Sequence, residues 1–143
     1  MQFQAPRQKF SNLLLVISFL IDSKSKQMYN FEKLKVWQES TKLIEIVYDQ
    51  ISQFPKDERY ALADQFKRAV TSVSLNIAEG SGSDSKKSFI LSLNIALKSL
   101  YEVVSILKIA ERLFHNDFDR SLYQADLVGK LLNGLIRSLK SDN

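Results

Sequence analysis

The sequence predicts an all-α protein: an antiparallel up-down four-helix bundle preceded by an N-terminal extension. Apolar residues recur at three- and four-residue steps through nearly all of the chain after Phe31, which is the period of an amphipathic helix. Only four Gly and two Pro occur in 143 residues, too few for the many turns of an all-β fold. Because the breaks in the pattern are short, we expect successive helices to run antiparallel.

Residues 1–27 differ in composition from the rest of the chain. Their charged residues are Arg7, Lys9, Lys24, Lys26 and Asp22. Four basic residues minus one acidic residue give +3, and the apolar run Leu13–Ile21 lies between the two basic pairs. Nine residues are too few to cross a hydrocarbon layer of ~30 Å as a helix, so we expect no membrane span. We expect an extension from upstream translation or a loosely attached tail, with Met28 as the functional start; a signal peptide and a segment packed on the helices are the alternatives.

We assign residues 28–143 to one domain, whose first two helices are separated by proline. The apolar positions of the first helix are Leu34, Trp37, Leu43, Ile44, Val47, Tyr48 and Ile51. We expect this helix to begin near Phe31 and to end at Phe54-Pro55, because proline disfavours a helical residue before it. The second helix should begin near Asp57, where a carboxylate suits a helix N-terminus. It should stop at Gly80, which can adopt the left-handed C-terminal conformation.

The third and fourth helices follow a serine-rich connection and a polar turn. Residues Ser81–Ser85 offer hydroxyl oxygens that can cap the third helix. The apolar pattern then continues to about Phe114, and His115–Asp117 should form the turn. The fourth helix is expected from Phe118 to about Leu139.

The second helix carries a polar line beside its apolar face. Its members are Gln65, Arg68, Ser72, Asn76 and Glu79. Steps of three, four, four and three place these residues along one side of a helix. The line is either an ordinary solvated face or a contact with another subunit or a ligand, and burial would require partners for its two charged members.

The charge of the predicted bundle offers little general attraction for nucleic acid. The whole chain carries +4, so subtracting the +3 of residues 1–27 leaves +1 for the remainder. The candidate nucleic-acid contacts are Lys67, Arg68, Lys86 and Lys87. They would bind phosphates without base specificity, and a mixed solvated surface is the alternative because acidic residues lie among them.

The residue types needed for common catalytic and metal sites are scarce. The chain has no cysteine and one histidine, which removes thiolate chemistry and the paired Glu-x-x-His ligands of di-iron bundles. His115 lies in the expected turn and is interpreted as a loop or C-terminal cap residue. We therefore expect no catalytic residue, no metal and no cofactor, and the absence of cysteine suits the reducing cytoplasm.

Five motifs in fixed order resemble one known family. They are F-x-x-L-x-V-W-Q at Phe31–Gln38, the pair Phe54-Pro55, K-R-A at Lys67–Ala69, S-x-x-x-N-I-A-E-G at Ser72–Gly80 and K-S-L-Y-E at Lys98–Glu102. From about Tyr29 to Leu139 the chain resembles the 23S rRNA-intervening-sequence family of four-helix-bundle proteins. The resemblance implies a bacterial cytoplasmic protein that forms a ring-shaped homo-oligomer, a pentamer, with kinship to the accessory protein of diversity-generating retroelements.

The sequence thus leads to two functional hypotheses. The first is a non-enzymatic, homo-oligomeric scaffold or interaction protein whose polar line lies at a contact between copies. The alternative is an accessory module that binds structured RNA and acts with a partner enzyme.

Overall fold

The described part of the chain is all α-helical, as the sequence predicts. The computed structural model describes residues 12–18, 29–58 and 60–141, and no strand occurs in these ranges. The elements are a short helix at residues 12–18, the 3₁₀ turns η1 (Asn30–Lys33) and η2 (Lys56–Glu58), and the long helices α2 (Lys35–Ile51), α3 (Leu62–Ser81), α4 (Lys86–Phe114) and α5 (Asp119–Ser141).

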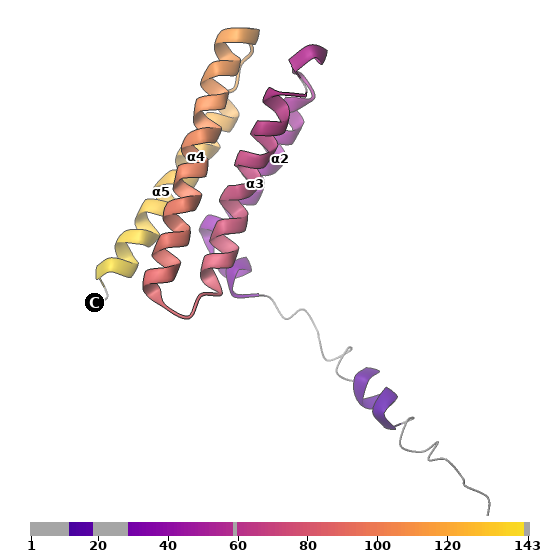
Figure 1. Cartoon of the computed structure of the whole chain (residues 1–143), viewed down its shortest axis with the longest axis vertical. Helices are drawn as coiled ribbons and strands as arrows, with labels where there is room; N and C mark the ends of the chain where they lie inside the picture. Colours follow the sequence, from indigo (N-terminus) through magenta and orange to yellow (C-terminus); the bar gives the residue numbers. More distant parts are fainter. Residues whose placement is uncertain (1–11, 19–28, 59, 142–143) are drawn as a thin grey trace, which may run out of the picture.

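Each of the four long helices packs against two of the others. The packed pairs are α2 with α3, α3 with α4, α4 with α5 and α2 with α5. The α3–α4 connection lies at the lower end of the view in Figure 1, and the α4–α5 connection lies at the upper end. The largest fully buried side chains come from all four helices and their connections: Phe54, Phe66, Phe118, Leu43, Ile77, Leu93, Leu107 and Leu132.

An aromatic cluster closes the core at one end. The ring of Phe54 lies 5.0 Å from Phe114, 5.9 Å from Phe118 and 6.2 Å from Phe66, measured between centroids. Offset and edge-to-face contacts at such distances are favourable beyond the area they bury. Phe54 therefore anchors the connection after α2 to three other segments.

Two helix starts differ from the sequence prediction. The first helix does not begin at Phe31, because residues Asn30–Lys33 form η1 and Leu34 is extended (ψ 120°) before α2 starts. The second helix begins at Leu62 rather than near Asp57, which lies in η2. Acidic residues can favour a helix start at Asp57, but only from Leu62 onward do side chains reach the core.

Gly80 does not end α3. The helix continues to Ser81, Gly82 is its cap, and no described glycine has a positive φ. A Cβ atom built on Gly80 would lie 2.6 Å from the Cβ of Ser92 on α4, closer than real Cβ contacts. This glycine is therefore required by the close approach of α3 and α4 rather than by its own backbone conformation.

The two turns around α4 follow the predicted chemistry. Ser85 Oγ accepts a hydrogen bond from the backbone N–H of Ser88 at 3.1 Å and caps the N-terminus of α4. At the other end His115 adopts the left-handed conformation, with φ 54°, and its N–H donates to the carbonyl of Glu111. The interpretation of His115 as a C-terminal cap is confirmed.

The helix at residues 12–18 exposes all of its apolar side chains. Leu13, Leu14, Leu15, Val16 and Ile17 are between 42% and 66% exposed. None of these side chains is buried against the long helices. The predicted boundary between residues 27 and 28 lies outside the described residues.

One helix in the described ranges has the length and composition to cross a membrane, namely α4, with a mean hydropathy of 1.6 over its most apolar window. Core helices of water-soluble proteins meet the same criterion, and α4 buries a face against α3 and α5. Composition alone therefore does not assign α4 to a membrane.

Candidate functional site

The predicted polar line lies along the seam between α3 and α4. Ser72 Oγ and Ser99 Oγ are 2.8 Å apart and share a hydrogen bond across the two helices. Asn76 Nδ2 donates back to the carbonyl of Ser72 at 2.8 Å and to its hydroxyl at 3.1 Å. The middle of the line thus has partners within the chain.

The ends of the line are more open. Gln65 Nε2 donates to the carboxylate of Glu102 on α4, and Arg68 Nη2 donates to Gln65 Oε1 at 2.7 Å. Glu79 is exposed and forms no ion pair with any residue that the structure describes. The remaining guanidinium donors of Arg68 and the carboxylate of Glu79 are therefore available to an external partner.

Large apolar side chains border the polar line on its outer side. Leu75 on α3 is 65% exposed, and Leu91 and Ile95 on α4 are 63% and 43% exposed. Helical spacing places Leu75 between Ser72 and Glu79 on the side of α3 away from the core. We call these three residues, together with the polar line, the α3–α4 outer face.

The predicted basic patch is not assembled. Lys67 Nζ lies 5.7 Å from the ring centroid of Tyr48 on α2, whereas Arg68 faces the α4 side. Lys86 and Lys87 begin α4, and roughly 20 Å of α3 separates them from Lys67 and Arg68. These four cations therefore do not form one contact surface on the chain.

A buried carboxylate joins α2 to α5. The Glu39 side chain is 5% exposed and pairs with Lys35 Nζ at 2.7 Å and Lys42 Nζ at 2.9 Å. Gln124 Nε2 donates to Glu39 Oε2 at 2.8 Å and to its backbone carbonyl at 2.9 Å. Hydrogen bonds from Lys35, then Gln124 and Lys42, lower the pKa of Glu39 to about 2, against the opposing effect of burial.

Two further buried polar pairs connect the helices. Ser40 and Ser74 hydroxyls lie 2.7 Å apart between α2 and α3, and Ser121 donates to Gln50 Oε1 between α5 and α2. Every buried side-chain nitrogen or oxygen in the described ranges has a partner. Satisfied pairs of this kind fix the register of packed helices.

This buried polar layer was not predicted, although the sequence contains a pattern that indicates it. Glu39 and Ser40 follow Val36 at steps of three and four, and Leu43 and Val47 continue the same spacing. Polar residues at core-spaced positions indicate a buried polar contact. The partners on α3 and α5 are known only from the fold.

No metal centre emerges from the described part of the chain. No group of three or more His, Asp or Glu side chains lies close enough there to hold an ion. The buried carboxylate of Glu39 is fully engaged by its lysine and glutamine partners.

These features define a small all-helical protein with a mixed polar and apolar outer face and satisfied internal pairs. The family model for the 23S rRNA-intervening sequence protein matches residues 32–134, and the chain belongs to that family. The fold is similar to that of a protein of unknown function from the S23 ribosomal protein family of Bacteroides thetaiotaomicron VPI-5482. That structure is 24% identical and has a TM-score of 0.64, and the similarity covers 71% of this chain and 95% of the other. No curated protein matches the chain.

Proposed function

We propose that the protein is a non-enzymatic, homo-oligomeric scaffold that assembles through the α3–α4 outer face. The proposal takes the four long helices as one antiparallel up-down bundle, which their pairwise packing supports. The carrying observation is the exposure of Leu75, Leu91 and Ile95 beside the polar line.

The chemistry of this face suits contact with another copy. Exposed apolar groups favour association because burial removes them from water, and the bordering polar groups set the geometry of the contact. Arg68 and Glu79 carry opposite charges at different heights of α3. Head-to-tail contacts that pair them between neighbouring copies would close into a ring, and the family resemblance suggests five copies in the bacterial cytoplasm.

Solution mass tests the assembly. Size exclusion coupled to light scattering at micromolar concentration should give a multiple of the 16.4 kDa chain mass. The double variant Leu75→Ser/Leu91→Ser should shift the protein toward one copy, because the interface loses two apolar contacts. Tyr123→Ser is the control, since this tyrosine on α5 is 76% exposed and lies outside the face. A 16.4 kDa species for the unmodified chain would end the proposal.

A charge variant tests the polar part of the same face. Arg68→Ala combined with Glu79→Ala should weaken assembly while the helical circular dichroism stays nearly unchanged, because both side chains are exposed. An unaltered oligomer mass would remove this pair from the interface. It would leave the apolar contacts to be judged by the serine variants.

A further inference from the structure

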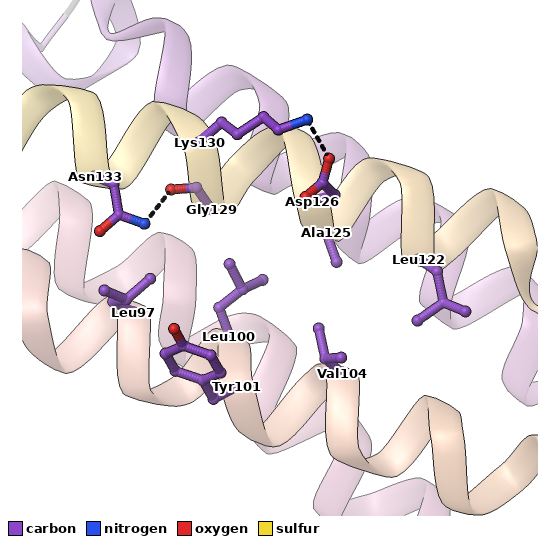
Figure 2. A pocket seen from close by; sticks show the side chains of 10 residues that line it. All are labelled: Leu97, Leu100, Tyr101, Val104, Leu122, Ala125, Asp126, Gly129, Lys130 and Asn133. Atoms are coloured by element: carbon purple, nitrogen blue, oxygen red, sulfur yellow. Dashed lines mark hydrogen bonds and ion pairs between the residues drawn. The ribbon is translucent and has the colours of Figure 1, made fainter.

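A groove runs between α4 and α5, on the other side of α4 from the α3–α4 outer face. Its upper part, which is nearer to the α4–α5 connection, has a volume of about 300 Å³. Figure 2 shows the side chains that line this part: Leu97, Leu100, Tyr101, Val104, Leu122, Ala125, Asp126, Gly129, Lys130 and Asn133. A second part, of about 550 Å³, also has Lys130 and Asn133 in its lining. The other residues that line this second, lower part are Asn94, Ile136, Arg137 and Lys140. The two parts adjoin at Lys130 and Asn133 on α5, and we call them together the α4–α5 groove.

The lower part of this groove is cationic. Lys130, Arg137 and Lys140 lie on one side of α5 at steps of seven and three residues. The only acidic residue after Asp126 in the sequence is Asp142, which lies outside the described residues. Lys130 Nζ pairs with Asp126 at 2.6 Å, whereas Arg137 and Lys140 are exposed and have no ion pair with a described residue.

The cations are spread along the groove rather than gathered at one point. From Lys130 to Lys140 the helix rises roughly 15 Å. A small anion would contact one end of this row, whereas a polyanion could contact all of it. The charge distribution therefore fits a chain of phosphates.

The remaining polar lining fits a ribose backbone. Asn133 Nδ2 donates to the carbonyl of Gly129 at 2.9 Å, and Asn94 Nδ2 donates to the carbonyl of Ile90 at 2.8 Å. Both amide oxygens are thereby left as acceptors without a donor among the described residues. An acceptor beside a phosphate-binding cation suits a 2′-hydroxyl, which RNA has and DNA lacks.

An aromatic side chain stands at the upper end of this cationic stretch. Tyr101 is 69% exposed and lies one heptad after Asn94, on the same side of α4. Figure 2 shows its ring across the groove from Asn133. An exposed ring can stack on a base only when that base is unpaired.

We propose that the α4–α5 groove binds single-stranded RNA, with Arg137 and Lys140 on phosphates, Asn94 and Asn133 on ribose hydroxyls and Tyr101 on a base. This proposal does not rest on self-assembly, because its residues lie outside the α3–α4 outer face.

The test is fluorescence anisotropy of a labelled twelve-nucleotide single-stranded RNA with the full chain. Two phosphate contacts predict a slope of about −1.4 for log K against log[salt], which weakens binding about 7-fold between 50 and 200 mM salt. Arg137→Ala/Lys140→Ala should flatten that slope by about 1.4. Lys33→Ala/Lys56→Ala, an equal change of charge at exposed residues outside the groove, should leave the slope unchanged.

Two further arms separate RNA from other ligands. A DNA oligonucleotide of the same sequence should bind several-fold more weakly, and Asn94→Ala/Asn133→Ala should remove that difference. Poly-glutamate should not compete. Four outcomes would each overturn the assignment. They are absence of binding at 50 mM salt, equal loss of affinity in the Arg137→Ala/Lys140→Ala variant and in the lysine control variant, equal affinity for DNA, and equal competition by poly-glutamate. Light scattering on the same samples shows whether assembly has changed independently.

Discussion

Glu39 is a carboxylate held almost entirely out of water between two lysines and a glutamine. Its pKa falls from 4.5 to about 2, first through the hydrogen bond from Lys35 and then through Gln124 and Lys42. A depressed pKa means that the stabilisation is complete above the unfolded value and is lost as the pH falls from about 4.5 to 2. Both lysines are exposed, and screening limits the contribution to roughly 1–2 kcal/mol.

Glu39→Gln should therefore lower the free energy of unfolding at pH 7 by roughly 1–2 kcal/mol, and by less at pH 3. Urea titrations at pH 7, 4 and 3 measure this difference. Glu45→Gln is the matched control because Glu45 is exposed on the same helix. If both variants show the same pH dependence as the unmodified chain, the Glu39 contacts do not contribute to stability.

The partner of Glu39 could not be predicted from the sequence. Gln124 lies 85 residues away, and only the packing of α2 against α5 brings the two together. In contrast, the caps at Ser85 and His115 depend on neighbouring backbone alone, and both are predictable from local residues. Helix caps can therefore be predicted from a single segment of sequence, whereas contacts between side chains on different helices cannot.

At the scale of helices, the close approach of α3 and α4 depends on Gly80. A methyl group there would meet the Ser92 Cβ at 2.6 Å and the Phe89 ring at 2.9 Å. Gly80→Ala should destabilise the protein by roughly 1–3 kcal/mol, because the helices must move apart. Urea unfolding checks the value.

Gly134→Ala is the control on α5. A Cβ at Gly134 meets nothing within 4 Å, so this variant should gain roughly 0.5–1 kcal/mol from better helix propensity. Opposite signs are expected for one and the same substitution at two helical positions. Equal effects would mean that the α3–α4 contact adapts to the added methyl group.

Helix existence was predictable from periodicity, but helix ends were less so. The pattern of apolar steps reports burial, and it located the four long helices because each buries one face. The predicted helix start near Asp57 and the predicted helix end at Gly80 were both wrong. Local propensity favoured those positions, whereas packing sets the ends of α3 at Leu62 and Ser81. The spacing of the polar line predicted that its residues share one side of a helix. Its hydrogen bonds to Ser99 and Glu102 could not be predicted, because these partners lie on the neighbouring helix.

For the whole molecule, the basic contacts show the same distinction. Lys67 and Lys86 lie on consecutive helices, α3 and α4. They are nevertheless far apart in space, because most of the length of α3 separates them. Arg137 and Asn94 are far apart in sequence and line one groove. A composition of nearly zero charge after Met28 therefore conceals a local segregation that only the fold makes visible.

The helix at residues 12–18 leads to the last prediction. A chain that begins at Met28 should keep its melting temperature within about 2 °C, because side chains that are 42% to 66% exposed contribute little burial to the long helices. A larger decrease would support the alternative that residues 1–27 pack on the helices. The mass of the shortened chain separates two modes of association: an oligomer that survives truncation depends on the helices that remain, whereas a single copy would mean that Leu13–Ile17 hold the copies together.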